Sequence, residues 1–336
     1  MYGSEIYNDF KKDIYWIRDR IQEEAPFFPD SMKPLIEHYT KSRLIIIPTK
    51  PKSGSGRKYD YELGRPVPYA VYWFADAFGL RDKKVYRKLG LGLIYSALTT
   101  TIRDDIIDSE SPPDPQCAKL LNYYNYKYLE VFEELFNKDS VFWYHLAKGF
   151  QETARYESWN LLFNNRLNVD PFSESFLEES SRYFTAVVMP TLTAIAILTD
   201  NESKISVASE FLRHFSMGWR IYDDFCDWKR DLKVDGFNHS SILLYILQYV
   251  QGETDLNEEI VYSMFLNPEF IGKSYGAILH FYEAAKSDVS GLNCKYLTKF
   301  MEEQISFHTK RRDNILSCAD ESKSEFLKQL DTILNM

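Results

Sequence analysis

Apolar residues recur at intervals of three and four along nearly the whole chain, which is the spacing of an amphipathic helix. Segments that alternate apolar and polar residues between turn dipeptides are nearly absent, so the pattern gives little sign of β-strands. We therefore predict an all-α protein. The predicted helices span 4–24, 29–46, 67–79, 82–108, 115–136, 139–165, 173–186, 188–199, 203–235, 239–251, 256–265, 269–288, 291–318 and 321–334.

Helix-breaking residues lie between these segments. Pro26 and Pro29 follow the first helix, and the sequence SPPDP follows the helix that carries Asp108. The segment 48–64 is rich in Gly, Ser and Lys and is the one long loop that the pattern predicts. Since we find neither an interdomain linker nor an internal repeat, we expect a single domain over residues 1–336.

Composition and charge narrow the class of protein. The 336 residues include 40 Lys and Arg against 49 Asp and Glu, for a net charge of −9. This balance argues against nucleic acid as the main partner, because binding there is driven by neutralising phosphates. No CxxC pair is present, the N-terminus lacks an apolar leader, and the apolar run at 186–198 is too short to cross a bilayer. We expect a cytoplasmic protein with reduced cysteines and no stable membrane insertion.

Two short segments carry unusual groups of aspartates. The first is TTTIRDDIIDSE, with Asp104, Asp105 and Asp108. At about 100° per residue on a helix, the three carboxylates project within an arc of roughly 100°. Ile106 and Ile107 lie among them, and a fully solvated acidic face would not need such apolar neighbours.

The second segment is GWRIYDDFCDWKRDL, with Asp223, Asp224, Asp227 and Asp231. The same geometry places these carboxylates within an arc of about 100° as well. Like charges so close require a counter-charge, and Mg²⁺ suits them because it prefers oxygen ligands and keeps phosphates and waters in its shell. Two such segments in one chain therefore indicate a magnesium site rather than two exposed acidic turns.

The pair of aspartate-rich segments resembles the motifs of the class I isoprenoid synthase superfamily, which comprises trans-prenyl diphosphate synthases, terpene synthases and squalene-type synthases. LGLIYSALTTTIRDDIID is similar to the helix that ends in the first motif, and HFSMGWRIYDDFCDWKRDL to the helix that carries the second. The resemblance covers residues 65–315. It implies a helical barrel around a deep active-site cavity, with both motifs at its mouth and three Mg²⁺ ions holding the diphosphate of an isoprenoid chain.

Residue by residue, the resemblance implies two Mg²⁺ ions at Asp104 and Asp108 and a third at the second motif. That motif fits the NDxxSxxxE pattern of terpene synthases through Asp223, Asp227 and Asp231, although all three are Asp here. It also fits a second DDxxD motif, so the spacing alone does not separate the branches. Whether Asp105 and Asp224 are metal ligands stays open.

The resemblance also implies arginines that bind diphosphate. Arg182 occupies the position of a diphosphate-sensing arginine, and Thr185 and Ala186 the linker and effector positions after it. The apolar segment 186–190 would interrupt the helix there. Arg suits this role because its planar fork binds phosphate oxygens in pairs. Further candidates are Arg230 and one of the late pair Arg311 and Arg312, after which the tyrosine of the family pattern is missing.

The branch of the superfamily depends on whether a second diphosphate binds. Elongating enzymes carry two arginines shortly after the first motif, whereas this chain continues with SESPPDPQ, where Glu110 and Asp114 would repel a second diphosphate. The aromatic content, 16% of the residues, favours a cavity that stabilises carbocations through ring faces. Besides Thr185 and Ala186, the cavity-lining candidates are Trp73, Phe78, Phe150, Trp159, Phe184 and Trp219.

The leading hypothesis is a Mg²⁺-dependent class I terpene synthase, a carbon–oxygen lyase that ionises and cyclises a linear C15 to C25 prenyl diphosphate. Asp104, Asp108, Arg182 and Asp223 would be its catalytic residues. A trans-prenyl diphosphate synthase or a squalene-type prenyltransferase is the alternative, and a non-catalytic subunit of the same fold is a third reading. Homodimers are common in the superfamily, so a second copy of the chain is an expected partner.

Overall fold

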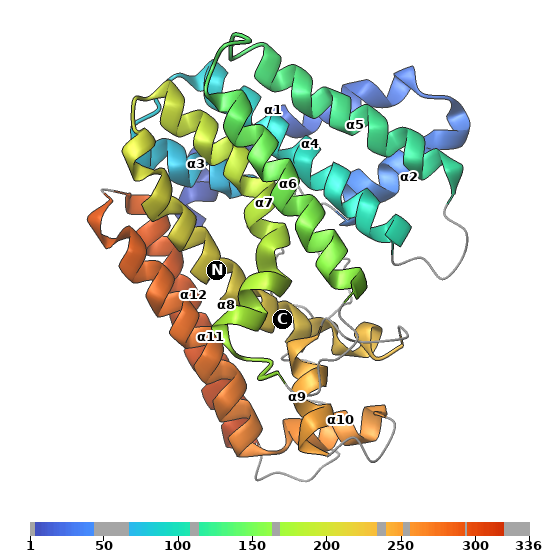
Figure 1. The fold of residues 1–336 in the computed structure, drawn as a ribbon, viewed down its shortest axis with the longest axis vertical. Coiled ribbons are helices and arrows are strands. Elements are labelled where there is room, and N and C mark those ends of the chain that lie inside the picture. The colour runs from blue at the N-terminus through green and yellow to red at the C-terminus, as the bar shows by residue number, and fades with distance from the viewer. Residues whose placement is uncertain are drawn as a thin grey trace. The chain divides into compact units, whose positions relative to one another are not determined.

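The computed structural model describes residues 4–43, 67–107, 114–162, 169–233, 240–250, 256–292 and 294–318, and every regular element in these ranges is a helix (Figure 1). The predicted all-α class is therefore confirmed. The chain divides into two compact units, which are described separately. The first comprises Met1–Gly149, Val187–Ile205 and Leu292–Lys299, and the second Phe150–Ala186, Ser206–Gly291 and Phe300–Met336.

The first unit is built on α3 (Val67–Phe78) and α4 (Lys83–Ile107). Nearly every residue of α3 is buried, as its uninterrupted apolar sequence requires. Helix α1 (Ser4–Glu24) is fixed to α4 by the buried carboxylate of Asp13, which lies 2.6 Å from the guanidinium of Arg87 and 3.1 Å from Nζ of Lys83. Helix α5 (Pro115–Glu133) packs along α4.

The start of α5 follows from its sequence. Asp114 is the N-cap residue, and its carboxylate accepts a hydrogen bond from the backbone N–H of Gln116. Pro115 occupies the first helical position, where the missing N–H costs nothing. Between α1 and α3, the short helix α2 (Lys33–Glu37) runs into a π-helical turn at His38–Arg43.

The second unit is centred on α8 (Ile205–Asp231), α11 (Pro268–Asp288) and α12 (Lys295–Cys318). The fully buried ring of Phe215 on α8 lies 5.6 Å, centre to centre, from the rings of both Tyr282 and Phe300.

The remaining helices are α6 (Phe142–Leu162), α7 (Glu174–Leu198), α9 (Ser241–Tyr249) and α10 (Glu258–Phe265). Side chains of Ser240, Asn257 and Asn267 cap the N-termini of α9, α10 and α11, so these boundaries follow from local sequence.

Some predicted boundaries are wrong. The helices predicted at 173–186 and 188–199 form one element, α7, that continues through Pro190. An interior proline removes one backbone hydrogen bond and crowds the carbonyl four residues earlier, so it can kink a helix without ending it. The two parts of α7, Glu174–Arg182 and Phe184–Leu198, are bent by 69°. The segment 29–46 contains α2 and shorter turns rather than one helix. The loop at 48–64 and the helix at 321–334 lie outside the described residues.

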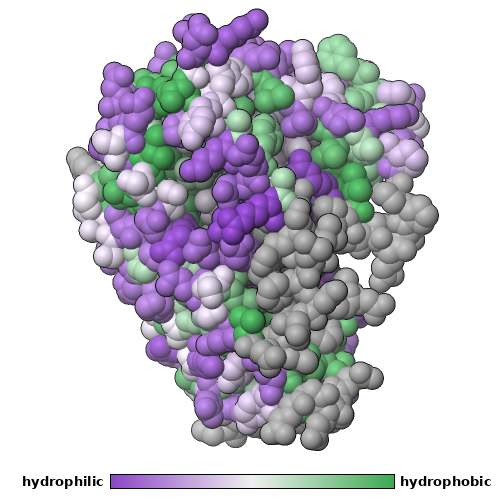
Figure 2. Space-filling model, in the orientation of Figure 1, coloured by the Kyte–Doolittle hydropathy of each residue, from purple (hydrophilic) through white to green (hydrophobic). Residues whose placement is uncertain are grey.

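In the described part of the chain, no single helix is long and apolar enough to span a membrane. The bent pair Glu174–Arg182 and Phe184–Leu198 meets the length and composition limits only when its halves are taken together. The face in Figure 2 is largely hydrophilic, with hydrophobic side chains scattered among polar ones. Exposed rings such as those of Tyr126 and Tyr144, 61% and 68% accessible, are ordinary as isolated surface residues.

Candidate functional site

The second aspartate cluster occupies the last turns of α8. Asp223, Asp227 and Asp231 follow one another at intervals of four, so they lie along one face of the helix. All three are partly accessible, whereas Asp224 is only 2% exposed. The cluster therefore presents three carboxylates to its surroundings and turns the fourth into the protein.

Asp224 is held within the second unit. Its Oδ2 accepts hydrogen bonds of 2.7 Å from both the backbone N–H and the hydroxyl of Ser241, and its Oδ1 lies 2.9 Å from the guanidinium of Arg220. Burial raises the pKa of Asp224 to about 7, although Arg220 and Ser241 oppose that rise. We therefore assign Asp224 the role of fixing the start of α9 against α8, which leaves the other three aspartates as the metal-ligand candidates.

The charges around Asp231 favour the binding of a cation. Burial is the main cause that raises its pKa to about 6, and the nearby carboxylates of Asp227 and Asp223 add to it. Arg220 and Arg230 act in the opposite direction. A divalent cation would relieve this repulsion, and hard oxygen donors are the ligands that Mg²⁺ prefers.

The carboxylates are not yet arranged as a closed metal site. Among the described residues, no three Asp, Glu, His or Cys side chains converge as ligands of one metal ion. The guanidinium of Arg230 instead lies 2.7 Å from Asp227 and 3.7 Å from Asp231. Since Mg²⁺ keeps waters and phosphate oxygens in its shell, α8 can supply part of the coordination while the substrate and water supply the rest.

The first aspartate cluster lies at the end of α4, in the first unit. Asp104 and Asp105 are partly accessible, and Asp108 lies outside the described residues. The hydroxyl of Tyr39, in the π-helical turn, is hydrogen-bonded to Asp105, and its pKa is raised by burial and then by that carboxylate. The sulfur of Cys117 is 3.9 Å from the same hydroxyl oxygen. Tyr39 therefore orients Asp105, and the sequence alone gave no signal for this contact.

Arg182, the predicted diphosphate sensor, is bound by acidic side chains. Its guanidinium lies 2.6 Å from Glu152 on α6 and 2.9 and 3.3 Å from Glu179 and Glu178 on its own helix. The two contacts within α7 join residues three and four positions apart, so they could have been anticipated from the sequence. The third contact, to Glu152, could not.

The late arginine pair divides into a buried and a more exposed residue. Arg311 is 4% exposed and donates a 2.6 Å hydrogen bond to the hydroxyl of Tyr222, whose ring it also faces. Arg312 lies 2.9 Å from its neighbour Asp313. Tyr222, which immediately precedes Asp223, is thus a neighbour of the candidate site that sequence reasoning missed.

The aromatic candidates fall in several places. In the second unit, Phe184 and Trp219 flank Phe215, with ring centres 5.3 and 6.2 Å away. Trp73 and Phe78 are buried in α3, and Phe150 is 41% exposed.

The side chain of Trp159 lies outside the described part of the structure. Thr185 and Ala186 are half-buried, and the hydroxyl of Thr185 is 3.2 Å from that of Ser216.

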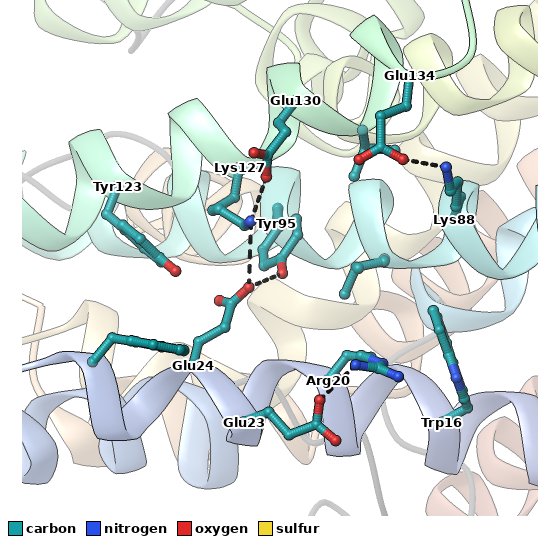
Figure 3. Close-up of a pocket in the computed structure, with 13 residues that line it drawn as sticks. Trp16, Arg20, Glu23, Glu24, Lys88, Tyr95, Tyr123, Lys127, Glu130 and Glu134 are labelled. Atoms are coloured by element: carbon teal, nitrogen blue, oxygen red, sulfur yellow. Dashed lines mark hydrogen bonds and ion pairs between the residues drawn. The ribbon is translucent and has the colours of Figure 1, made fainter.

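A separate groove of about 640 Å³ lies in the first unit, between α1 on one side and α4 and α5 on the other (Figure 3). The carboxylate of Glu24 accepts a hydrogen bond from Tyr95 and lies 3.9 Å from Lys127. Lys127 also pairs with Glu130. None of the predicted site residues is among those described as lining it, and its charged side chains largely neutralise one another.

No family model matches the chain, and no curated protein matches it significantly. Solved structures do match. A polyprenyl synthase from Caulobacter crescentus CB15, in complex with calcium and isoprenyl diphosphate, is 14% identical, with a TM-score of 0.65 over 92% of this chain and 98% of that one.

Two further structures are similar over nearly their whole length. A geranylgeranyl pyrophosphate synthetase from the archaeon Geoglobus acetivorans is 16% identical, with a TM-score of 0.60 over 90% of this chain and 99% of that one. A decaprenyl diphosphate synthase from Rhodobacter capsulatus is 13% identical, with a TM-score of 0.64 over 92% and 99%. The chain therefore has the all-α isoprenoid synthase fold of these prenyl synthases, as the aspartate motifs predicted.

Proposed function

We propose that the protein is a metal-dependent enzyme that acts on an isoprenyl diphosphate, and that its reaction is the transfer of a prenyl group to a second prenyl substrate. The observation that carries this proposal is the row of Asp223, Asp227 and Asp231 on one face of α8, in a chain with the fold of prenyl synthases. The similar structures favour this alternative over the cyclase that the sequence suggested first.

The donor set of α8 suits magnesium, and the complex of the Caulobacter synthase contains calcium, another oxygen-seeking divalent cation. Asp223, Asp227 and Asp231 would hold one ion, and Asp104 and Asp108 the others of the expected three. Bound there, magnesium would neutralise the diphosphate and so favour its departure as a leaving group.

The chain's own residues would orient the substrate and bind its charge. Arg230 lies beside Asp227 and Asp231 and would contact a diphosphate held at that cluster. Arg182 would bind phosphate oxygens in exchange for one of its carboxylate partners. When the allylic carbon–oxygen bond breaks, the electron pair leaves with the diphosphate, and aromatic faces such as that of Trp219 would stabilise the allylic cation. The double bond of the second substrate would then form the new carbon–carbon bond, and loss of a proton to the released diphosphate would restore an alkene.

Terpene cyclisation is the second candidate, and one observation favours it. The segment after the first motif, SESPPDPQ, contains no arginine and includes Glu110, while Asp114 caps α5. A second diphosphate would meet negative charge there. Cyclisation needs only one diphosphate, because the cation reacts with a double bond of its own chain.

Product analysis separates the two reactions. The purified protein is incubated with Mg²⁺ and C10 to C25 prenyl diphosphates, with and without isopentenyl diphosphate, and products are identified by mass spectrometry. A longer prenyl diphosphate formed only with isopentenyl diphosphate supports prenyl transfer. A hydrocarbon or terpene alcohol formed without it supports cyclisation instead, and absence of any product overturns both.

Matched variants show whether the proposed site is responsible. Asp227→Asn removes a ligand charge while keeping the side-chain size, and we expect it to abolish most of the metal-dependent turnover. Asp30→Asn is the control, because this exposed carboxylate is paired with Lys33, which is not a candidate site residue. Equal loss in both variants would argue against a specific role for α8.

A further inference from the structure

The glutamates around Arg182 form a clasp, which we define as Glu152, Glu178 and Glu179. Glu152 reaches Arg182 from α6 at 2.6 Å, while Glu179 and Glu178 reach it from one turn earlier in α7, at 2.9 and 3.3 Å. The side chain of Arg182 is 22% exposed. Its guanidinium is therefore compensated by acidic groups from two helices before any anion arrives.

The members of the clasp differ in what else they bind. Glu179 also lies 3.4 Å from Arg155, and Glu178 lies 3.7 Å from Arg213. Among the described residues, Glu152 forms an ion pair with Arg182 and with no other side chain. Glu152 is thus the clasp residue that pairs with Arg182 and not with a second arginine.

We propose that Glu152 is a positioning residue that holds Arg182 in a resting position, and that a diphosphate exchanges with this carboxylate when it binds. The inference rests on the proposed function, since it requires a diphosphate ligand. It assigns a role to a residue that lies in neither aspartate cluster. The diphosphate site is then completed only when the diphosphate replaces Glu152 as the anionic partner of Arg182. Arg182 is not free to bind the diphosphate beforehand.

A diphosphate can replace Glu152 because it binds an arginine more strongly than an accessible carboxylate does. The side chain of Glu152 is 41% exposed, and ion pairs at such accessible positions stabilise proteins by about 0.2–1 kcal/mol. A phosphate carries more charge than a carboxylate and offers several oxygens to the fork of an arginine. A diphosphate beside Arg182 can therefore displace Glu152 at a small cost.

The same stretch of α7 is in contact with the helix of the second aspartate cluster. The hydroxyl of Ser216 on α8 is 3.4 Å from that of Ser181 and 3.2 Å from that of Thr185, one residue before and three after Arg182. Ser216 also donates to the backbone carbonyl of Arg213. A shift of Arg182 would thus act on a segment packed against α8, two turns before Asp223.

Binding of inorganic diphosphate in the presence of Mg²⁺, measured by calorimetry, tests the clasp without turnover. Removing a competing ion pair of this strength in Glu152→Gln should tighten binding by about 1.4- to fivefold. The KM for a prenyl diphosphate should fall similarly, with kcat little changed. Unchanged or weaker binding would overturn the proposal.

Two controls make the result specific. Glu302→Gln removes the 3.4 Å ion pair between an exposed carboxylate on α12 and Lys286, neither of which pairs with a clasp residue, and should leave diphosphate affinity unchanged. In an Arg182→Gln background, Glu152→Gln should have no further effect, because the contact it removes is already gone. A similar gain in that background would show that Glu152 acts through its charge alone and would overturn the clasp.

The outcome also separates this inference from the proposed function. If the folded wild-type protein binds neither diphosphate nor prenyl diphosphate with Mg²⁺, the proposed function fails and the clasp fails with it. If the wild type binds diphosphate and Glu152→Gln binds it equally, only the clasp fails. Circular dichroism and the melting temperature confirm that each variant is folded before its affinity is compared.

Discussion

Arg311 on α12 donates a 2.6 Å hydrogen bond to the hydroxyl of Tyr222 on α8, one residue before Asp223. The ring of Tyr222 also packs against the imidazole of His308, with 4.6 Å between the ring centres. His308 is fully buried. Burial and then the charge of Arg311 hold the pKa of His308 well below its usual range, so this imidazole is neutral. The arginine therefore secures the part of α8 from which the aspartate row begins.

Removing the hydroxyl of Tyr222 tests this contact. In Tyr222→Phe the buried guanidinium of Arg311 loses a hydrogen-bond acceptor, so we expect the free energy of unfolding to fall by about 1.5–3 kcal/mol. Urea denaturation measures the change. Arg312→Gln, at the adjacent position of the same helix, should shift the free energy by no more than about 0.5 kcal/mol. Equal effects of the two substitutions would contradict the structural role of the pair.

Replacing glycine by alanine should have opposite effects on stability at two positions. A Cβ atom on Gly218 of α8 would lie 2.6 Å from the ring of Tyr282, so Gly218→Ala should cost about 1–3 kcal/mol through overpacking. On α11, a Cβ on Gly276 would meet no atom within 4 Å, and Gly276→Ala should stabilise the helix by about 0.5–1 kcal/mol. Thermal unfolding of both variants measures the pair. A neutral Gly218→Ala would mean that α8 and α11 are less closely packed than described.

Asp224 makes stability depend on pH. Its pKa is raised in the fold from 3.8 to about 7, mainly by burial, so the folded state holds a proton that the unfolded chain has released. The contribution of this group is therefore most favourable at low pH and is lost as the pH rises through 7. Between pH 5 and 8, the free energy of unfolding of the wild type should fall by on the order of 2 kcal/mol relative to Asp224→Asn. Parallel pH profiles of the two proteins would contradict the raised pKa.

The sequence predicted features that depend on neighbours along the chain. The apolar periodicity located α1 at Ser4–Glu24, and it placed the helix at 269–288 within one residue of α11, Pro268–Asp288. The aspartate row on α8 follows from helical spacing alone. Each of these features is set within about two turns of helix, so local pattern is sufficient.

Contacts between distant segments were beyond that reasoning. Nothing in the sequence relates Asp224 to Ser241, or Arg311 to Tyr222, because both pairs depend on how α8 packs against later helices. The helix end predicted between 186 and 188 was wrong, because α7 continues through Pro190, although its two parts, Glu174–Arg182 and Phe184–Leu198, are bent by 69°. Aspartates of one motif therefore cannot be divided into metal ligands and structural groups from spacing alone.

The last prediction concerns metal binding at the aspartate row. The pKa of Asp231 is raised to about 6, first by burial and also by Asp227 and Asp223, so its carboxylate is largely ionised at pH 7 and largely protonated at pH 5. A proton on this oxygen competes with a cation, and the affinity for Mn²⁺, used as a probe for Mg²⁺, should fall by up to about tenfold per pH unit below 6. Calorimetric titration at pH 5, 6 and 7 measures this slope. Asp231→Asn should bind the ion more weakly at pH 7 and with a flatter pH profile, because its amide does not titrate. If the variant keeps the slope of the wild type, another group is the titrating ligand and Asp231 is not part of the metal site.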